Sequence, residues 1–254
     1  MLKKRLIGVV TVRQGLAVQS FGYSRYLPLG SPELVIENLD RWGADEILVQ
    51  CIDRSVQKLG PDFSLLKRVG DLGLSTPLIY GGGIRHTDDA VKVISLGADR
   101  ILIDSILWDS QPMIEAISRE LGVQAVIANM PVHIKLGQIY WRNYRSSEEV
   151  LLNINTAQQL PIEWISEILL TDWRHEGFSK GFDRRIPLVF PIIKNPFILF
   201  GGLSEYDQYT DVLSIPNVVG VGIGNFLSYK EHAIQNIKDK ITAISLRTAH
   251  YTAE

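Results

Sequence analysis

Two glycine-rich segments carry the residue types best suited to bind an anion. Gly81–Gly83 and Gly201–Gly202 each end a short apolar run, and without a Cβ atom their backbone N–H groups can closely approach phosphate oxygens. Ser105 and Asn225 lie at the ends of later apolar runs and can donate hydrogen bonds to the same oxygens. Glycines also occur where a strand simply turns tightly into a helix, so one such segment alone would leave both interpretations open.

The two glycine segments belong to an internal repeat. Pro77–Gly83 (PLIYGGG) matches Pro196–Gly202 (PFILFGG), and Ile101–Ser105 (ILIDS) matches Val221–Asn225 (VGIGN), both at an offset of about 120 residues. Duplication of a half-barrel would explain this offset. The repeat favours phosphate binding, because two equivalent turns suit a ligand that carries two phosphate groups.

Eight short apolar runs, each followed by a longer amphipathic stretch, are the expected strands. They are Leu6–Val12, Ile47–Cys51, Pro77–Tyr80, Ile101–Ile103, Gln124–Ala128, Ile168–Thr171, Phe197–Phe200 and Val218–Ile223. Continuous hydrophobicity is typical of strands buried on both faces, and Pro32–Trp42, Asp88–Leu96 and Pro112–Leu121 are expected to be crossover helices. An open doubly wound sheet would show the same alternation, but the repeat favours one α/β domain over residues 1–254, a (β/α)8 TIM barrel with two half-barrels.

Two segments depart from this regular pattern. Asp183–Lys194 contains Pro187 and Pro191, so we expect the sixth helix to be short or distorted. Pro131–Ser146 alternates apolar and polar residues and predicts a hairpin-like insertion that lies over the catalytic rim.

Composition excludes several classes of partner. A formal net charge of -2 gives no reason to expect nucleic acid or an anionic membrane, and no apolar run is long enough to span a membrane. The N-terminus lacks the features of a secretory signal and Cys51 is the only cysteine, which predicts a cytoplasmic protein. Cys51 could be a nucleophile, but without a histidine placed to activate it a buried structural thiol is favoured. The histidines show no metal-ligand spacing, so neither a metal nor a cofactor is predicted.

A family resemblance covers nearly the whole chain. The segments that carry it are KRLI (Lys4–Ile7), RWGADEI (Arg41–Ile47), YGGGIR (Tyr80–Arg85), LGADR (Leu96–Arg100), EILLT (Glu167–Thr171) and FGG (Phe200–Gly202). Their order and spacing resemble the cyclase subunit of imidazole glycerol phosphate synthase. The resemblance implies a barrel that binds a bisphosphorylated ribonucleotide at its upper rim and receives ammonia from a glutaminase subunit docked below. The phosphate-binding residues would be Gly82, Gly83, Ser105, Gly177, Gly201, Gly202, Gly224 and Asn225.

The two catalytic aspartates of the family are replaced in this sequence. Ungapped comparison places them at Thr11 and Met130, and neither a hydroxyl nor a thioether can replace a carboxylate in proton transfer. A shift of a residue or two would bring Asp53 or Asn129 into these roles, and Glu176 keeps a carboxylate found in the family. Further differences at the rim occur at Cys51, Gln19 and Asp104.

The lower face keeps the charges of the family's ammonia gate. They map onto Arg5, Glu46, Arg100 and Glu167, with Asp99 beside them at a position that faces the glutaminase in the family. Retention of all four signs favours a glutaminase partner. The alternative is that arginine and glutamate simply neutralise each other where buried charges must be paired.

Two functions are consistent with these residues, and whether the chain is an active enzyme stays open. The first is a divergent cyclase-like subunit that uses glutamine-derived ammonia on a phosphorylated ribonucleotide or sugar nucleotide, in histidine or surface-polysaccharide biosynthesis. The second is a catalytically inactive scaffold that binds a phosphorylated ligand or activates a glutaminase, which loss of both aspartates would allow.

Overall fold

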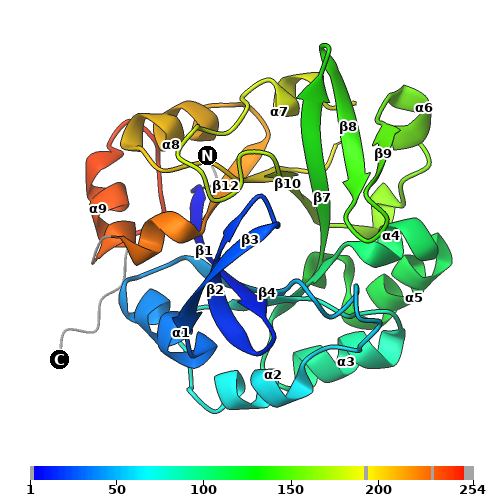
Figure 1. Ribbon diagram of the computed structural model, residues 1–254, viewed down its shortest axis with the longest axis horizontal. Helices are drawn as coiled ribbons and strands as arrows, with labels where there is room; N and C mark the ends of the chain where they lie inside the picture. Colours follow the sequence, from blue (N-terminus) through cyan, green and yellow to red (C-terminus); the bar gives the residue numbers. More distant parts are fainter. Residues whose placement is uncertain (1–2, 192–193, 230–231, 249–254) are drawn as a thin grey trace.

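Eight parallel strands close into a barrel in the computed structural model, which describes residues 3–191, 194–229 and 232–248 (Figure 1). Around the barrel the strands follow the chain order, and the last pairs with the first. They are β1 (Arg5–Arg13), β4 (Glu46–Cys51), β5 (Leu78–Gly81), β6 (Arg100–Ile103), β7 (Val126–Lys135), β10 (Glu167–Asp172), β11 (Phe197–Phe200) and β12 (Val218–Ile223). The predicted α/β barrel is therefore confirmed.

Helices connect successive strands and surround the barrel (Figure 1). The α-helices are α1 (Pro32–Arg41), α2 (Phe63–Gly70), α3 (Thr87–Ser95), α4 (Ser105–Asp109), α5 (Gln111–Leu121), α6 (Ile154–Ala157), α7 (Ile186–Val189), α8 (Tyr206–Leu213) and α9 (Ala233–Lys240). Short 3-10 turns are η1 (Val123–Ala125), η2 (Ile162–Trp164) and η3 (Asn225–Ser228). The three predicted crossover helices correspond to α1, α3 and α5, and no helix among the described residues is long and apolar enough to cross a membrane.

The barrel strands are buried on both faces, which explains their continuous hydrophobicity. One set of side chains meets inside the barrel: Ile7, Val9, Leu48, Ile79, Leu102, Ile127, Leu169, Ile198 and Phe200. The alternate residues of each strand pack against the helices in a larger core. Because successive side chains of a strand point to opposite faces, each inward side chain is followed two residues later by another that is nearer the mouth.

Two hairpins extend the barrel at the C-terminal ends of its strands. The first joins β1 to β2 (Leu16–Phe21) and β3 (Arg25–Gly30), and the second joins the long β7 to β8 (Gln138–Asn143) and β9 (Glu148–Leu151). The insertion predicted for residues 131–146 is thus a β-hairpin. The first hairpin was not predicted, because β3 is largely exposed and the buried residues of β2 include Gln19 and Ser20, so neither strand has a continuous apolar run.

The sixth helix is as short as its prolines indicate. Helix α7 spans four residues, with Pro187 in its first turn and Pro191 just beyond its end. Ile192 and Ile193 of the predicted segment lie outside the described residues.

Candidate functional site at the barrel mouth

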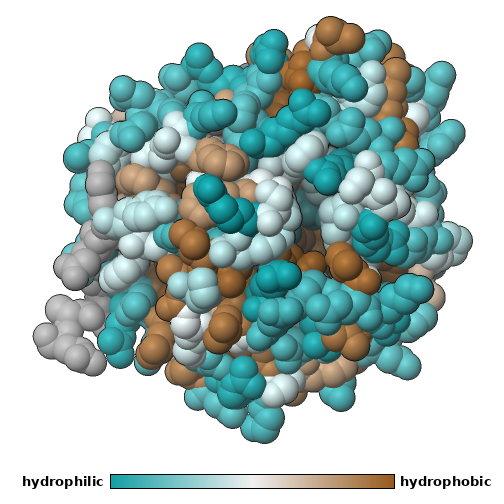
Figure 2. Space-filling view, viewed as in Figure 1, coloured by the Kyte–Doolittle hydropathy of each residue, from teal (hydrophilic) through white to brown (hydrophobic). Residues whose placement is uncertain are grey.

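A cavity of about 450 Å³ opens at the mouth of the barrel. Its walls come from the C-terminal ends of β4 to β7 and from both hairpins, and Figure 2 shows a hollow beside the β2–β3 hairpin. Asp104 is the single carboxylate and Arg142 the single cationic side chain among its lining residues. Carboxyl ends of barrel strands are where active sites form in this fold, so this cavity is the candidate site.

Asp104 is held by a chain of hydrogen bonds across three strands. Asn129 Nδ2 donates to Asp104 Oδ2 at 2.6 Å, and Thr171 Oγ1 donates to Asn129 Oδ1 at 2.7 Å. Asp104 Oδ1 is inaccessible to solvent and has no hydrogen-bond partner among the described residues. Burial raises the pKa of Asp104 to about 7, although the Asn129 hydrogen bond and the Arg145 charge oppose this shift. The carboxyl can therefore exchange a proton near neutral pH.

Arg142 of β8 brings a guanidinium group to the same cavity. Its central carbon lies 3.9 Å from the centre of the Trp173 ring, a cation–π contact. Its Nε atom is buried without a hydrogen-bond partner, and the group forms no ion pair with a described carboxylate. An arginine stacked in this way leaves donors available for a carboxylate or phosphate of a ligand.

Uncharged hydrogen-bond donors lie around Gly81–Gly83, the first glycine turn. Gly83 N donates to Ser55 Oγ at 3.3 Å, Ser105 Oγ lies 3.3 Å from the same atom, and Tyr144 forms side-chain hydrogen bonds with both serines. A Cβ atom at Gly82 would lie 2.4 Å from the Cys51 carbonyl oxygen, so only glycine fits this turn. Three of the predicted phosphate-binding residues thus line the main cavity.

The second glycine turn faces a separate and smaller cavity of about 200 Å³. The remaining predicted phosphate-binding residues line it: Gly177, Gly201, Gly202, Gly224 and Asn225. The Asn225 amide is already engaged, since Oδ1 accepts from Ser20 N at 3.2 Å and Nδ2 donates to Ser20 O at 2.6 Å. Glu176 and Glu205 also line this cavity, without a cationic side chain among its described walls. The second glycine turn is therefore less suited to bind an anion than the first.

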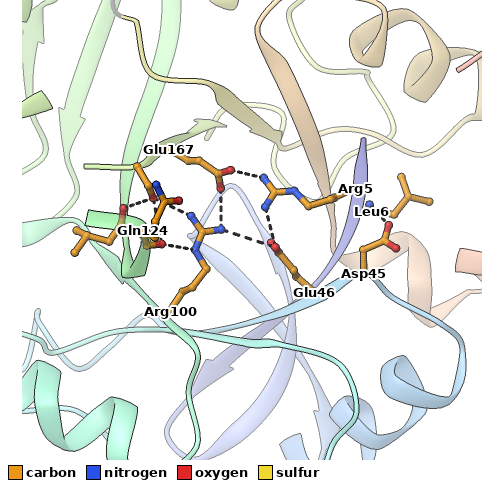
Figure 3. A network of polar contacts seen from close by, with 9 residues as sticks. Arg5, Leu6, Asp45, Glu46, Arg100, Gln124 and Glu167 are labelled. Carbon is orange, nitrogen blue, oxygen red and sulfur yellow. Dashed lines mark hydrogen bonds and ion pairs between the residues drawn. The ribbon is translucent and has the colours of Figure 1, made fainter. Parts of the chain in front are cut away.

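A closed ring of four charges lies at the opposite end of the barrel (Figure 3). Arg5 lies 2.8 Å from Glu46 and 2.6 Å from Glu167, while Arg100 lies 2.8 Å from Glu167 and 3.8 Å from Glu46. Burial raises the pKa of Glu46 despite both arginines, and its Oε2 has no hydrogen-bond partner among the described residues. The sequence comparison thus identified four residues that meet in one network.

Comparison with known proteins places the chain in a family. Residues 5–233 match the family described as histidine biosynthesis protein. The chain belongs to this family. It is 27% identical over 242 residues to a putative imidazole glycerol phosphate synthase subunit of Vibrio vulnificus, covering 92% of this chain and 86% of that protein. It is also 28% identical over 218 residues to an imidazole glycerol phosphate synthase subunit of Sulfolobus acidocaldarius, covering 85% of this chain and 87% of that protein.

The two positions assigned to the family's aspartates lie apart from the main cavity. Thr11 is buried and lines a third cavity between β1, α1 and the end of β12. Met130 packs in the core between strands and helices, whereas its neighbours Asn129 and Pro131 line the mouth. The ungapped comparison therefore selects a helix-facing residue on β7, and neither of the mouth-facing residues beside it is a carboxylate.

The three alternative candidates have different surroundings. Asn129 lies in the cavity beside Asp104. Asp53 is outside it, where Oδ2 accepts a hydrogen bond from Gln14 N at 2.7 Å near the surface. Glu176 is buried, accepts hydrogen bonds from Ser20 Oγ and Tyr23 N, and has its pKa raised by burial to about 6. Its contacts connect the β2–β3 hairpin to the loop after β10.

Two further residues noted in the sequence, Cys51 and Asp99, are both held by their surroundings. Burial raises the pKa of the Cys51 thiol to about 12, which agrees with a structural thiol. Asp99 accepts a hydrogen bond from Leu78 N at 2.8 Å beside the ring.

The sequence analysis did not identify Arg142 and Tyr144, which reach the cavity from the second hairpin. The alternating pattern of that segment was the one signal that could have located them.

Proposed function

We propose that this chain is a synthase subunit of the imidazole glycerol phosphate synthase type. In this role it receives ammonia from a glutaminase at its lower face and uses it on a phosphorylated substrate at its mouth. The observation that carries the proposal is the arrangement along the barrel axis. From one end to the other, the barrel has a ring of charges, an apolar interior and a cavity that contains Asp104, Arg142 and several hydroxyl groups.

The ring is suited to control entry from the lower face. Three of its contacts measure 2.6–2.8 Å, whereas Arg100 lies 3.8 Å from Glu46. Separation of this one pair costs the least, because the Coulomb energy falls with distance. A docked glutaminase would therefore open the ring between Arg100 and Glu46.

The cavity favours a substrate with one anionic group near the first glycine turn. Ser55, Ser105 and Tyr144 supply hydroxyl donors there, and Arg142 supplies a positive charge elsewhere in the same cavity. These groups suit a phosphorylated ribonucleotide or a sugar nucleotide. The altered mouth residues favour a substrate other than that of the usual cyclase, in histidine or surface-polysaccharide biosynthesis.

A test of this function combines the chain with a glutaminase from the same genome. We expect the two to co-elute and glutamine hydrolysis to increase when the chain is present. Amide-¹⁵N glutamine is then supplied together with small-molecule extract of the source cells, and mass spectrometry detects labelled phosphorylated products. Glu167→Gln, which weakens the ring, should reduce labelling, whereas Glu115→Gln on the exposed face of α5 should not. Absence of both complex and stimulation would overturn the proposal.

A non-catalytic activator is the second candidate. It is favoured by the lack of a carboxylate at Thr11, Asn129 and Pro131. For an activator, hydrolysis of glutamine increases but all labelled nitrogen is recovered as free ammonia. The same mass-spectrometric experiment therefore separates the two functions.

A further inference from the structure

We propose that Asp104 forms an ammonium-binding site at the floor of the mouth cavity, where nitrogen that arrives through the barrel is held before it reacts. The inference rests on the proposed delivery of ammonia and adds the residue that receives it. The ligand class is a small monovalent cation with N–H donors, the ammonium ion itself.

The position of Asp104 along the barrel supports this site. Asn129 of β7 and Thr171 of β10 each follow an inward apolar residue by two positions, on the same face of their strands. Asp104, the residue directly after β6, follows the inward Leu102 by two positions and lines the cavity with Asn129. Gln50 has the same relation to Leu48 on β4 and also lines the cavity. These residues form the first polar layer above the apolar interior. A molecule that moves upward through the barrel therefore meets their oxygen atoms first.

The hydrogen bonds of this layer leave one carboxylate oxygen for a ligand. Thr171 orients the Asn129 amide, and Asn129 occupies Asp104 Oδ2. Oδ1 is buried and has no partner among the described residues. A buried polar atom without a partner is costly, so a ligand atom that donates a hydrogen bond to Oδ1 would be favoured here.

The charge of Asp104 also lacks a counterion in contact with it. Arg145 pairs with Asp109, and Arg142 stacks on Trp173 instead of contacting the carboxylate. An ammonium ion would supply the missing positive charge, and its N–H groups could donate to Asp104 Oδ1 and to Gln50 Oε1, which lines the same cavity. Gln50 Oε1 already accepts a long hydrogen bond of 3.4 Å from Tyr23 and has a further lone pair.

The proton balance of the site is simple. A protonated Asp104 carboxyl and an ammonia molecule become a carboxylate and an ammonium ion, with one proton moved from Oδ1 to nitrogen. The reverse transfer returns the proton to Oδ1 and frees the nitrogen lone pair for attack on a substrate. Because the pKa of Asp104 is raised to about 7 by burial, both directions are accessible near neutral pH.

The groups around Asp104 allow its titration to be isolated. Tyr23 and Tyr144 face it from the two hairpins, and burial raises the pKa of each, so both stay neutral below pH 9. Arg145 stays charged, and burial lowers the pKa of His133, four residues beyond Asn129. Glu176, with its pKa raised to about 6, lines the neighbouring cavities. A change that Asp104→Asn abolishes therefore belongs to Asp104.

The experiment measures the transverse relaxation of ¹⁵N-ammonium chloride added to the full chain, with tetramethylammonium chloride holding ionic strength constant. We expect the protein-dependent increase in relaxation rate at pH 8 to fall at least about fivefold in Asp104→Asn. Between pH 8 and pH 6 the wild-type increase should fall about tenfold, as Asp104 becomes protonated. Asp71→Asn, which removes an equal charge from an exposed pair with Lys67 on α2, is the matched control and should retain the wild-type effect.

Circular dichroism of each variant checks that the fold is intact. Equal relaxation in wild type and Asp104→Asn would overturn the site, as would the absence of any protein-dependent effect in the wild type. Neither result bears on whether a glutaminase binds. Loss of the ammonium site with retained glutaminase binding would therefore remove this inference and leave the proposed function in place.

Discussion

The two ends of the barrel carry buried charges in opposite ways. At the lower end, Arg5 and Arg100 contact Glu46 and Glu167 in one ring. At the mouth, Asp104 and the half-buried Arg142 share a cavity, and neither forms an ion pair with a described residue. Charges that form ion pairs with one another hold parts of the fold together, whereas charges left unpaired in a cavity are available to bind a ligand. The four predictions that follow test this difference, beginning with the largest effect.

The strongest test removes one of the two arginines of the ring. Arg5→Ala leaves Glu46 and Glu167 without their shared guanidinium, and both carboxylates are largely buried. We expect a loss of about 3–5 kcal/mol in the free energy of unfolding, measured by urea denaturation. Lys67→Ala breaks an exposed pair with Asp71 and should change stability by about 0.5 kcal/mol or less. Similar losses in both variants would mean that the ring does not stabilise the barrel.

A second substitution tests which side chain of β7 faces the mouth. Met130→Asp places a carboxylate in the helix-facing core and should destabilise the fold by about 3 kcal/mol in the same assay. Met130→Leu conserves volume and should cost less than about 1.5 kcal/mol. If Met130→Asp is tolerated as well as Met130→Leu, residue 130 would have access to solvent at the mouth.

The pH dependence of stability tests the unpaired carboxyl. The pKa of Asp104 is about 7 in the folded chain, above its value in the unfolded chain. The folded chain therefore binds the proton more tightly, and its stability falls as the pH rises from the unfolded pKa to about 7. Asp104→Asn should therefore stabilise the chain more at pH 8 than at pH 5, by about 2 kcal/mol. Urea denaturation at both values measures this difference. A pH-independent effect of the substitution would show that Asp104 is paired in solution.

The smallest expected effect concerns anion binding at the first glycine turn. Tyr144→Phe removes the hydroxyl that bonds Ser55 and Ser105 and should weaken binding of inorganic pyrophosphate about fivefold, or about 1 kcal/mol. Calorimetry measures the affinity. Tyr140→Phe on the same hairpin removes an exposed hydroxyl 3.5 Å from Gln138 and should leave it unchanged. Equal affinities for the two variants would contradict an anion site at the first turn.

The architecture could be predicted from the sequence because its signal is local. Runs such as Ile168–Thr171 are buried on both faces, and the half-chain repeat separated a closed barrel from an open sheet. The ring could also be identified, because each of its residues begins a strand within a motif of the resembled family. The β2–β3 hairpin was missed because its exposed face has no continuous hydrophobicity.

The mouth could be predicted only in part. Asp104 was noted as a changed position, but its lack of a partner depends on where Asn129 and Arg145 lie, and no spacing along the chain encodes that. Met130 illustrates a second limit. A shift of one residue exchanges the two faces of a strand, so the comparison without gaps selected a residue of β7 that faces the helices, between two residues that face the mouth.

The connection between the β2–β3 hairpin and the second half of the barrel has a consequence for affinity. Ser20 is fastened by Asn225 and Glu176, and the same hairpin contributes Tyr23 and Tyr26 to the cavity wall. A loop that is already ordered has little conformational entropy left to lose when a ligand arrives. Asn225 and Glu176 of the second half-barrel thus serve the mouth by pre-organising one of its walls. Release of Ser20 would weaken ligand binding without removing any direct contact.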